Sequence, residues 1–349
     1  MKRQLILGAL ASQYWALEPS YFKTMTGAVT NWAINGAVTH EAMVEIEAAQ
    51  AARAARKQSN TAIGGGIAVL SLYGVISQRA AMMDDICGSG GTSTERFTQS
   101  FRDAMADDSV GGIIIDIDSP GGSVFGVADL YDEIMSARGV KPVYGFVNSL
   151  CASAAFWIGS ACVQLFAKQG SMTGSLGVYT GHENVAEAMK MAGVSFEFIS
   201  AGKYKVESNP YGPLSDEARA FSQSQVNDYY SAFSGAVAKG RGAPIAQARD
   251  GMGEGRCLLP ADALTAGMID AVETFDGVVK RMGKAMKSNG ASAAVIPAGM
   301  LAGAIIDTDD PEMADRIANA TITHIERHIA DTTAARIAAR NRALEIAAL

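Results

Sequence analysis

The segment at residues 112–118 constrains the fold of this chain more than any other. It reads GIIIDID, and a short isoleucine run bounded by glycine and acidic residues predicts a strand buried on both faces of a sheet. Strand and helix patterns alternate on either side of it. Further strands are expected at 67–77, 141–147, 163–167 and 195–199, and helices at 94–107, 124–137, 149–160, 182–192, 215–239 and 256–270. This alternation predicts an α/β fold with a mainly parallel sheet and helices outside it.

The chain divides into three regions that differ in residue composition and spacing. Residues 1–62 are rich in helix formers with charges spaced three to four apart, which predicts a helical amino-terminal extension. Residues 63–287 carry the alternating pattern and are expected to form one domain. Residues 288–349 begin with small residues and continue with periodic arginines, which predicts a flexible linker and a helical carboxy-terminal tail.

Composition excludes several classes of protein. The net charge of the 349 residues is −7 without a basic stripe, so binding to nucleic acid through its phosphates is not expected. Four scattered cysteines are too few for a disulfide framework. The apolar run 5–11 is short for a signal peptide, and the run 291–306 is interrupted by Pro297 and too short to span a bilayer. We therefore expect a cytoplasmic protein that is not exported and has no stable membrane anchor.

Two glycine- or alanine-rich turns follow expected strands. In Ser119-Pro120-Gly121-Gly122, glycines allow a sharp turn whose free N–H groups can hold negative charge on a substrate oxygen, although the same sequence suits an ordinary turn. Ser153 lies among small residues at the start of a helix, where a substrate backbone could approach. Serine at such a position is also a common helix cap.

Two further elements could contribute to a site. Ser175 lies in the turn TGSLGV at an expected strand end. Lys203 and Lys205 follow the expected strand 195–199, where a lysine is normally a solvated charge. Burial disfavours the ammonium form, however, and a neutral lysine can act as general base for a serine.

Other catalytic arrangements are not supported. None of the four histidines suits a Ser-His-Asp triad, and the pair at positions 324 and 328 lacks the zinc-site spacing. The glycines near residue 253 do not match a dinucleotide fingerprint. Cys151 has no plausible histidine base and is interpreted as a small buried residue. We expect neither a cofactor nor a metal ion.

Taken in order, these elements resemble the signal peptide peptidase A family of Ser-Lys peptidases, which have the crotonase/Clp protease fold. The resemblance covers roughly residues 66–285. It rests on IAVLSLYGVIS, DSPGGSVFG, NSLCASAAFWIGSAC, GSMTGSLGVY, SAGKYKVESNPYGPLSDEAR and ADALTAGMID.

The resemblance implies a role for each element. Ser153 matches the nucleophile, and Lys205 the general base, with Lys203 as the alternative if the register is shifted. Ser175 matches the serine that holds the lysine amine. The N–H of Gly121, with Gly122 beside it, and the N–H of Ala154 match the oxyanion hole.

A soluble, single-unit chain of this type resembles the head maturation proteases of tailed phages. This implies an endopeptidase that cleaves scaffold and capsid proteins in the host cytoplasm or procapsid, and a homo-oligomer. Three alternatives remain open: a host peptidase that degrades signal peptides, a catalytically silent capsid-assembly protein, and an acyl-CoA enzyme of the crotonase type.

Overall fold

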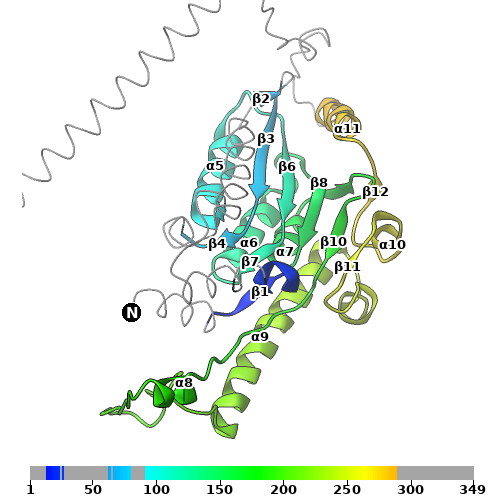
Figure 1. Ribbon diagram of the computed structural model, residues 1–349. Coiled ribbons are helices and arrows are strands. Elements are labelled where there is room, and N and C mark those ends of the chain that lie inside the picture. Colours follow the sequence, from blue (N-terminus) through cyan, green and yellow to red (C-terminus); the bar gives the residue numbers. More distant parts are fainter. Residues whose placement is uncertain (1–12, 24–25, 27–61, 64–65, 80–90, 289–349) are drawn as a thin grey trace, which may run out of the picture. The chain divides into compact units, whose positions relative to one another are not determined.

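The computed structural model describes residues 13–23, 26, 62–63, 66–79 and 91–288. Its centre consists of three parallel strands, β3 (Ile67–Tyr73), β6 (Gly112–Ser119) and β8 (Val143–Ala152), with β6 in the middle (Figure 1). This confirms the expected α/β class with a parallel sheet.

Shorter strands extend this sheet at β8. The first half of β8 pairs in parallel with β9 (Gln164–Ala167), and its last residues pair in parallel with β10 (Met172–Gly174). The remaining strands of this sheet are β2 (Ala62–Ile63), β11 (Cys257–Leu258) and β12 (Ala271–Val272). Because β6, β8 and β10 run in the same direction, their carboxyl ends meet at one edge of the sheet.

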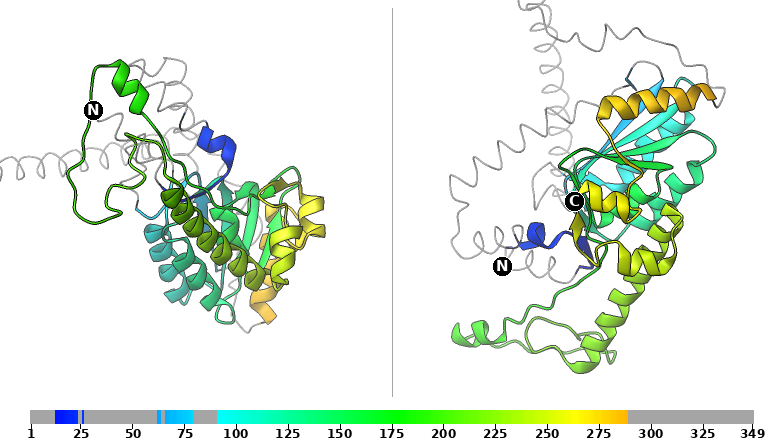
Figure 2. Two further views of the ribbon diagram at one scale, coloured as in Figure 1. Left: turned by 90° about the horizontal axis from the view of Figure 1, so that it is seen from below. Right: turned by 90° about the vertical axis from the view of Figure 1, so that its right-hand side faces the viewer.

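Both faces of the sheet are covered, which explains the isoleucine run. Ile113, Ile115 and Ile117 belong to one core, whereas Ile114 belongs to a second core with Val278, Met282 and Met286 of α11 (Phe275–Ser288). The first core contains side chains of the helices α5 (Thr94–Ala106), α6 (Val127–Ala137), α7 (Ala154–Ser160), α9 (Asp216–Arg241) and α10 (Pro260–Thr265). Figures 1 and 2 show α11 on the opposite side of the sheet from α5 and α6.

A second, small sheet lies next to the carboxyl end of β6. Its order is β1 (Trp15–Leu17), β7 (Gly121–Ser123), β4 (Ile76–Ser77) and β5 (Thr92–Ser93). β7 follows directly on β6 in the chain, and β1 pairs with it in antiparallel orientation. Residues 15–17, which the sequence placed in a helical extension, are therefore a strand. The rest of that extension and residues 289–349 lie outside the described residues.

Three other expectations were wrong. The helix expected over 256–270 begins only at Pro260, because Cys257–Leu258 form β11 and pair with β10. The helix expected from residue 149 begins at Ala154, because β8 continues to pair with β10 through Ala152. The segment 195–199 is exposed and forms no strand, since no described strand lies beside it to share hydrogen bonds. It belongs to a long excursion between Tyr179 and α9 that includes the short helix α8 (Ala186–Met191). We call residues 182–214 the arm; around α8 it lies away from the sheet (Figures 1 and 2).

Packing of α9 against α7 gives a prediction about stability. A Cβ at Gly240 would lie 2.3 Å from the Ser160 carbonyl oxygen, whereas a Cβ at Gly235 would meet nothing within 4 Å. We expect Gly240→Ala to lower the free energy of unfolding by about 1–3 kcal/mol through overpacking. Gly235→Ala, in the same helix, should raise it by about 0.5–1 kcal/mol, because alanine favours the helix. Urea denaturation followed by circular dichroism measures both, and equal shifts for the two variants would contradict this packing.

Candidate active site

Ser153 occupies a strained turn between β8 and α7. Its backbone has φ 56° and ψ −118°, and the residue is 1% exposed. A non-glycine residue at positive φ costs on the order of 1–3 kcal/mol and persists only where its surroundings hold it. The Ser153 N–H donates to the Gly174 carbonyl at 2.7 Å, and its own carbonyl accepts from the Trp157 N–H at 2.9 Å. Strain of this kind is typical of functional turns.

The hydroxyl of Ser153 does not cap the helix that follows it. The structure records no capping hydrogen bond from this side chain, and its contact with the Gly177 carbonyl is long, at 3.5 Å. The alternative interpretation of Ser153 as a helix cap is therefore wrong. A sharp strand-to-helix turn whose serine hydroxyl does not cap the helix is an arrangement that hydrolases use for a nucleophile.

Ser175 follows the neighbouring strand at the same level. In the parallel pairing of β8 with β10, Ala152 lies opposite Gly174, so Ser153 and Ser175 each come next after a paired residue. Ser175 also has positive φ, at 55°, and is buried. Its N–H donates to the Arg256 carbonyl at 2.8 Å. Two residues that are far apart in sequence are thus brought to one edge of the sheet.

The glycine turn after β6 lies next to the start of α7, close to Ser153. Gly121 has φ 93°, and a Cβ there would lie 2.9 Å from the Ala154 nitrogen. A Cβ at Gly122 would lie 1.9 Å from the Ile76 carbonyl oxygen, so this position also requires glycine. Gly121 and Ala154, the two groups that the sequence suggested as an oxyanion hole, are therefore close neighbours.

Ser119 is a residue whose role the sequence did not reveal. Its buried hydroxyl donates to the Gly74 carbonyl at 2.6 Å and accepts from the Gly121 N–H at 3.2 Å. The hydroxyl therefore fixes the turn before β7. A substrate oxygen that used the Gly121 N–H would have to replace this long hydrogen bond. The signal available in the sequence was the serine two residues before a glycine, a spacing that allows such a local hydrogen bond.

Among the described residues, no lysine forms a recorded hydrogen bond with Ser153. Lys205 and Lys203 are both exposed residues of the arm. The Lys203 ammonium donates to the Tyr204 hydroxyl at 2.6 Å and to the Glu217 carboxylate at 2.9 Å. These partners raise the pKa of Lys203 above its usual value, so it stays charged at neutral pH. A charged ammonium cannot accept a proton, so Lys203 is not a base in this arrangement.

Cys151, two residues before Ser153, is not a competing nucleophile. It is fully buried, and this burial raises the pKa of its thiol well above the usual range. The reactive species of a cysteine is the thiolate, which is scarce at neutral pH under these conditions. Cys151 therefore has the packing role that its sequence context suggested.

The described residues also give no support to metal or histidine chemistry. No group of three or more histidine, cysteine or acidic residues could hold a metal ion within the described ranges. The ring Nε2 of His182 lies 3.2 Å from the Gly212 carbonyl oxygen, within the arm. In the same part of the chain no helix is long and apolar enough to cross a membrane.

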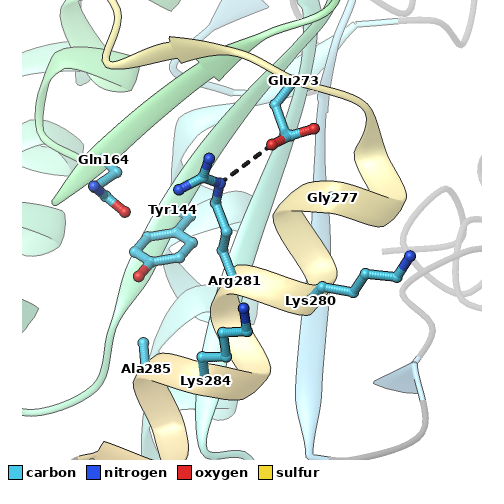
Figure 3. A pocket seen from close by; sticks show the side chains of 8 residues that line it. All are labelled: Tyr144, Gln164, Glu273, Gly277, Lys280, Arg281, Lys284 and Ala285. Atoms are coloured by element: carbon cyan, nitrogen blue, oxygen red, sulfur yellow. Dashed lines mark hydrogen bonds and ion pairs between the residues drawn. The ribbon is translucent and has the colours of Figure 1, made fainter.

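A pocket of about 650 Å³ lies elsewhere, beside α11 (Figure 3). It is lined by Tyr144, near the start of β8, and by Arg281, which forms an ion pair with Glu273 at 3.3 Å. Ser153 follows the other end of β8. This pocket is therefore separate from the turns described above.

Comparison with known proteins shows a similarity to one family of peptidases. Residues 136–289 match Peptidase family S49. Over these residues, which make up less than half of the chain, the protein is similar to S49 peptidases. The matched range includes Ser153, Ser175 and Lys205, whereas Gly121 and Gly122 precede it.

Relatives come from phages and from cellular organisms. Capsid assembly protease C of Escherichia phage lambda is 29% identical over 73% of this chain and 59% of the relative. Head-tail preconnector protein GP5 of Enterobacteria phage P21 is 33% identical over 64% and 44%, respectively. Protease 4 of Haemophilus influenzae is 27% identical over 62% and 34%. The chain thus spans about half the length of the phage relatives that it matches.

Solved structures are similar at lower identity. A ClpP1 variant from Listeria monocytogenes is 15% identical, with a TM-score of 0.38 over 60% of this chain and 94% of that chain. The 1510-N membrane protease specific for a stomatin homolog from Pyrococcus horikoshii is 16% identical, with a TM-score of 0.38 over 62% and 77%.

The burial of Cys151 gives a prediction about reactivity. We expect iodoacetamide in mildly alkaline buffer to leave Cys151 unmodified in the folded protein, because its thiol is inaccessible and protonated. After unfolding, the same residue should be alkylated. Peptide mass spectrometry measures the modified fraction in each state. Rapid alkylation in the folded state would make Cys151 a rival nucleophile to Ser153.

Proposed function

We propose that this protein is a serine endopeptidase whose nucleophile is Ser153. The observation that carries this proposal is the meeting of three turns at one edge of the sheet. The Ser153 turn, the Ser175 turn and the Gly121-Gly122 turn follow β8, β10 and β6, respectively. The similarity to S49 peptidases is consistent with this chemistry.

In the proposed reaction the Ser153 oxygen attacks a peptide carbonyl carbon. The carbonyl oxygen becomes negatively charged and accepts hydrogen bonds from the N–H groups of Gly121 and Ala154. Loss of one such donor typically costs on the order of 2.7–4 kcal/mol of transition-state stabilisation. The proton of the serine passes to a neutral lysine amine, which returns it to the leaving amine. Water then hydrolyses the acyl-enzyme by the same route.

Lys205 is the base in this proposal, with Ser175 holding its amine. In the single chain Lys205 is exposed, so the arm has to pack against another surface before the lysine loses its proton. The arm has the composition for such packing. Phe196 and Phe198 are 54% and 40% exposed, and the Phe196 ring stacks on Tyr211 with centroids 4.4 Å apart. We propose that a second copy of the chain covers these rings in a homo-oligomer.

The proposed substrates are proteins of a phage head, such as scaffold and capsid proteins. The names of two relatives, a capsid assembly protease and a head-tail preconnector protein, support this choice. A catalytically silent assembly protein on the same fold is the main alternative. It would not react with an acylating serine probe.

Ser153→Ala should abolish cleavage of a fluorescent unfolded protein, with a loss of at least about 1,000-fold, because the nucleophile is removed. It should also abolish labelling by a fluorophosphonate probe. Ser149→Ala is the matched control, since Ser149 is an exposed serine of the same strand. Wild-type cleavage by Ser153→Ala, or an equal loss in Ser149→Ala, would contradict the proposed nucleophile.

Lys205→Ala should abolish turnover, and Lys203→Ala should retain it, because Lys203 is a solvated ion pair with Glu217. Steady-state hydrolysis of the same substrate compares the two variants. Loss of activity in Lys203→Ala alone would assign the base to that residue instead.

Mixing two inactive variants tests the source of the lysine. If a second copy supplies Lys205, then Ser153→Ala mixed with Lys205→Ala recovers activity, because some sites combine both intact residues. We expect this recovery. A mixture that stays inactive, while subunit exchange is shown by a labelled copy, would mean that each arm serves its own chain.

A further inference from the structure

We propose that β1, the strand Trp15–Leu17 near the start of the chain, occupies the groove that an extended substrate peptide enters. The segment would then act as a tethered competitive inhibitor that must leave before a substrate binds. This inference rests on the serine-peptidase function proposed above, and it adds the regulation of that site and the kind of peptide that the site accepts.

One edge of β1 lies along the glycine turn. The two strands are antiparallel, with Leu17 opposite Gly121 and Ala16 opposite Gly122. Beyond the strand, the Glu18 N–H donates to the Pro120 carbonyl at 2.8 Å. An extended peptide that adds to a sheet edge makes the same kind of backbone hydrogen bonds. β1 therefore uses the backbone edge that a substrate would need.

The other edge of β1 lies along the chain that leaves the Ser175 turn. The Trp15 N–H donates to the Tyr179 carbonyl at 2.8 Å, and the Tyr179 N–H donates to the Trp15 carbonyl at 3.0 Å. The Thr180 hydroxyl donates to the Gln13 carbonyl at 3.0 Å. Thus β1 is held between the two segments that carry Gly121 and Ser175.

A carbonyl of β1 also lies close to the proposed oxyanion hole. The position of a Cβ on Gly121 is 2.3 Å from the Ala16 carbonyl oxygen and 2.9 Å from the Ala154 nitrogen. The strand backbone is thus adjacent to the group that would bind the carbonyl oxygen of a substrate. Ordinary edge pairing far from the chemistry would not produce this proximity.

The side chains of β1 indicate what the groove accepts. Side chains alternate along a strand, so Trp15 and Leu17 share one face and Ala16 lies on the other. All three are buried, with 1%, 1% and 0% exposure, respectively. The Trp15 ring packs against Phe22 at a centroid distance of 5.9 Å. We infer that the substrates are extended segments with large apolar residues on either side of a small one.

Tethering explains why such a strand would inhibit. A segment of the same chain binds in an intramolecular step, so a free peptide must compete against its effective local concentration. Tyr14 also helps to keep β1 in position. Its hydroxyl donates to the Gln225 side chain, and its ring lies 5.2 Å from that of Tyr229. Both partners belong to α9, which begins directly after the arm.

The test measures peptide binding rather than hydrolysis. A fluorescein-labelled synthetic peptide with the sequence of residues 13–19, QYWALEP, is titrated against the full chain carrying Ser153→Ala, and anisotropy is recorded. Adding Trp15→Ala removes a buried side chain of β1 and should open the groove. We expect the double variant to bind the peptide about tenfold more tightly or better, because the binding-competent fraction rises.

Two controls separate this effect from general loosening. Phe101→Ala removes a buried ring from α5, and Tyr21→Ala removes a side chain that is 45% exposed beyond β1. Neither should increase the affinity for the peptide. Equal affinity with and without Trp15→Ala, an equal gain in Phe101→Ala, or no binding to any variant would overturn the inference.

A reversible lock provides a second measurement. Trp15 and Ser123 are opposite each other in the antiparallel pair, and cross-strand positions of this kind have the Cα spacing that a disulfide requires. In the Ser153→Ala chain with Trp15→Cys and Ser123→Cys, oxidation should abolish peptide binding and reduction should restore it. Equal binding in both states would overturn the inference.

The outcomes also distinguish this inference from the proposed function. If binding depends on β1 but the wild-type chain never hydrolyses a peptide, the groove is confirmed and the peptidase function fails. If the wild-type chain hydrolyses peptides through Ser153 but peptide affinity is the same with and without Trp15→Ala, the proposed function is supported. The proposal that β1 is an inhibitor is then wrong.

Discussion

The parallel pairing of β8 with β6 on one side and β10 on the other is the interaction on which the rest of this structure depends. Parallel strands end at the same edge of a sheet, so the turns after them meet there. The register of Ala152 with Gly174 decides that Ser153 and Ser175 start from the same level. A slip by one residue would reverse the faces of every side chain in β8 and separate the two serines.

Close backbone approach is the second constraint, and it follows from the first. Gly121 and Gly122 lie so near to the start of α7 and to β4 that a Cβ would collide with backbone atoms. This proximity would allow the N–H groups of two different segments to donate hydrogen bonds to one substrate oxygen. The strain at Ser153 and Ser175 is tolerated because hydrogen bonds to Gly174 and Arg256 hold both turns. The core supports these turns, because Ala154, Ala155 and Phe156 of α7 are completely buried.

Two further parts of the chain, the arm and β1, carry groups that we propose act at this edge of the sheet. The arm carries Lys205, the proposed base, and exposes the rings of Phe196 and Phe198. β1 lies between the glycine turn and the segment that follows Ser175, and it forms backbone hydrogen bonds with both. In the single chain, Lys205 is therefore exposed, and β1 is paired with the segment that carries Gly121.

The sequence by itself determined the α/β class, the central buried strand and the turns that carry Ser153, Ser175 and Gly121, because hydrophobic periodicity and glycine placement are local signals. It could not determine that residues 15–17 form a strand, since that strand exists only by pairing with Gly121–Ser123 more than a hundred residues away. Nor could it determine that 195–199 stays unpaired or that β8 continues to Ala152. Backbone pairing between distant segments decided these features, because hydrogen bonds in a sheet are made by whichever edge lies alongside and not by the residues of one segment alone.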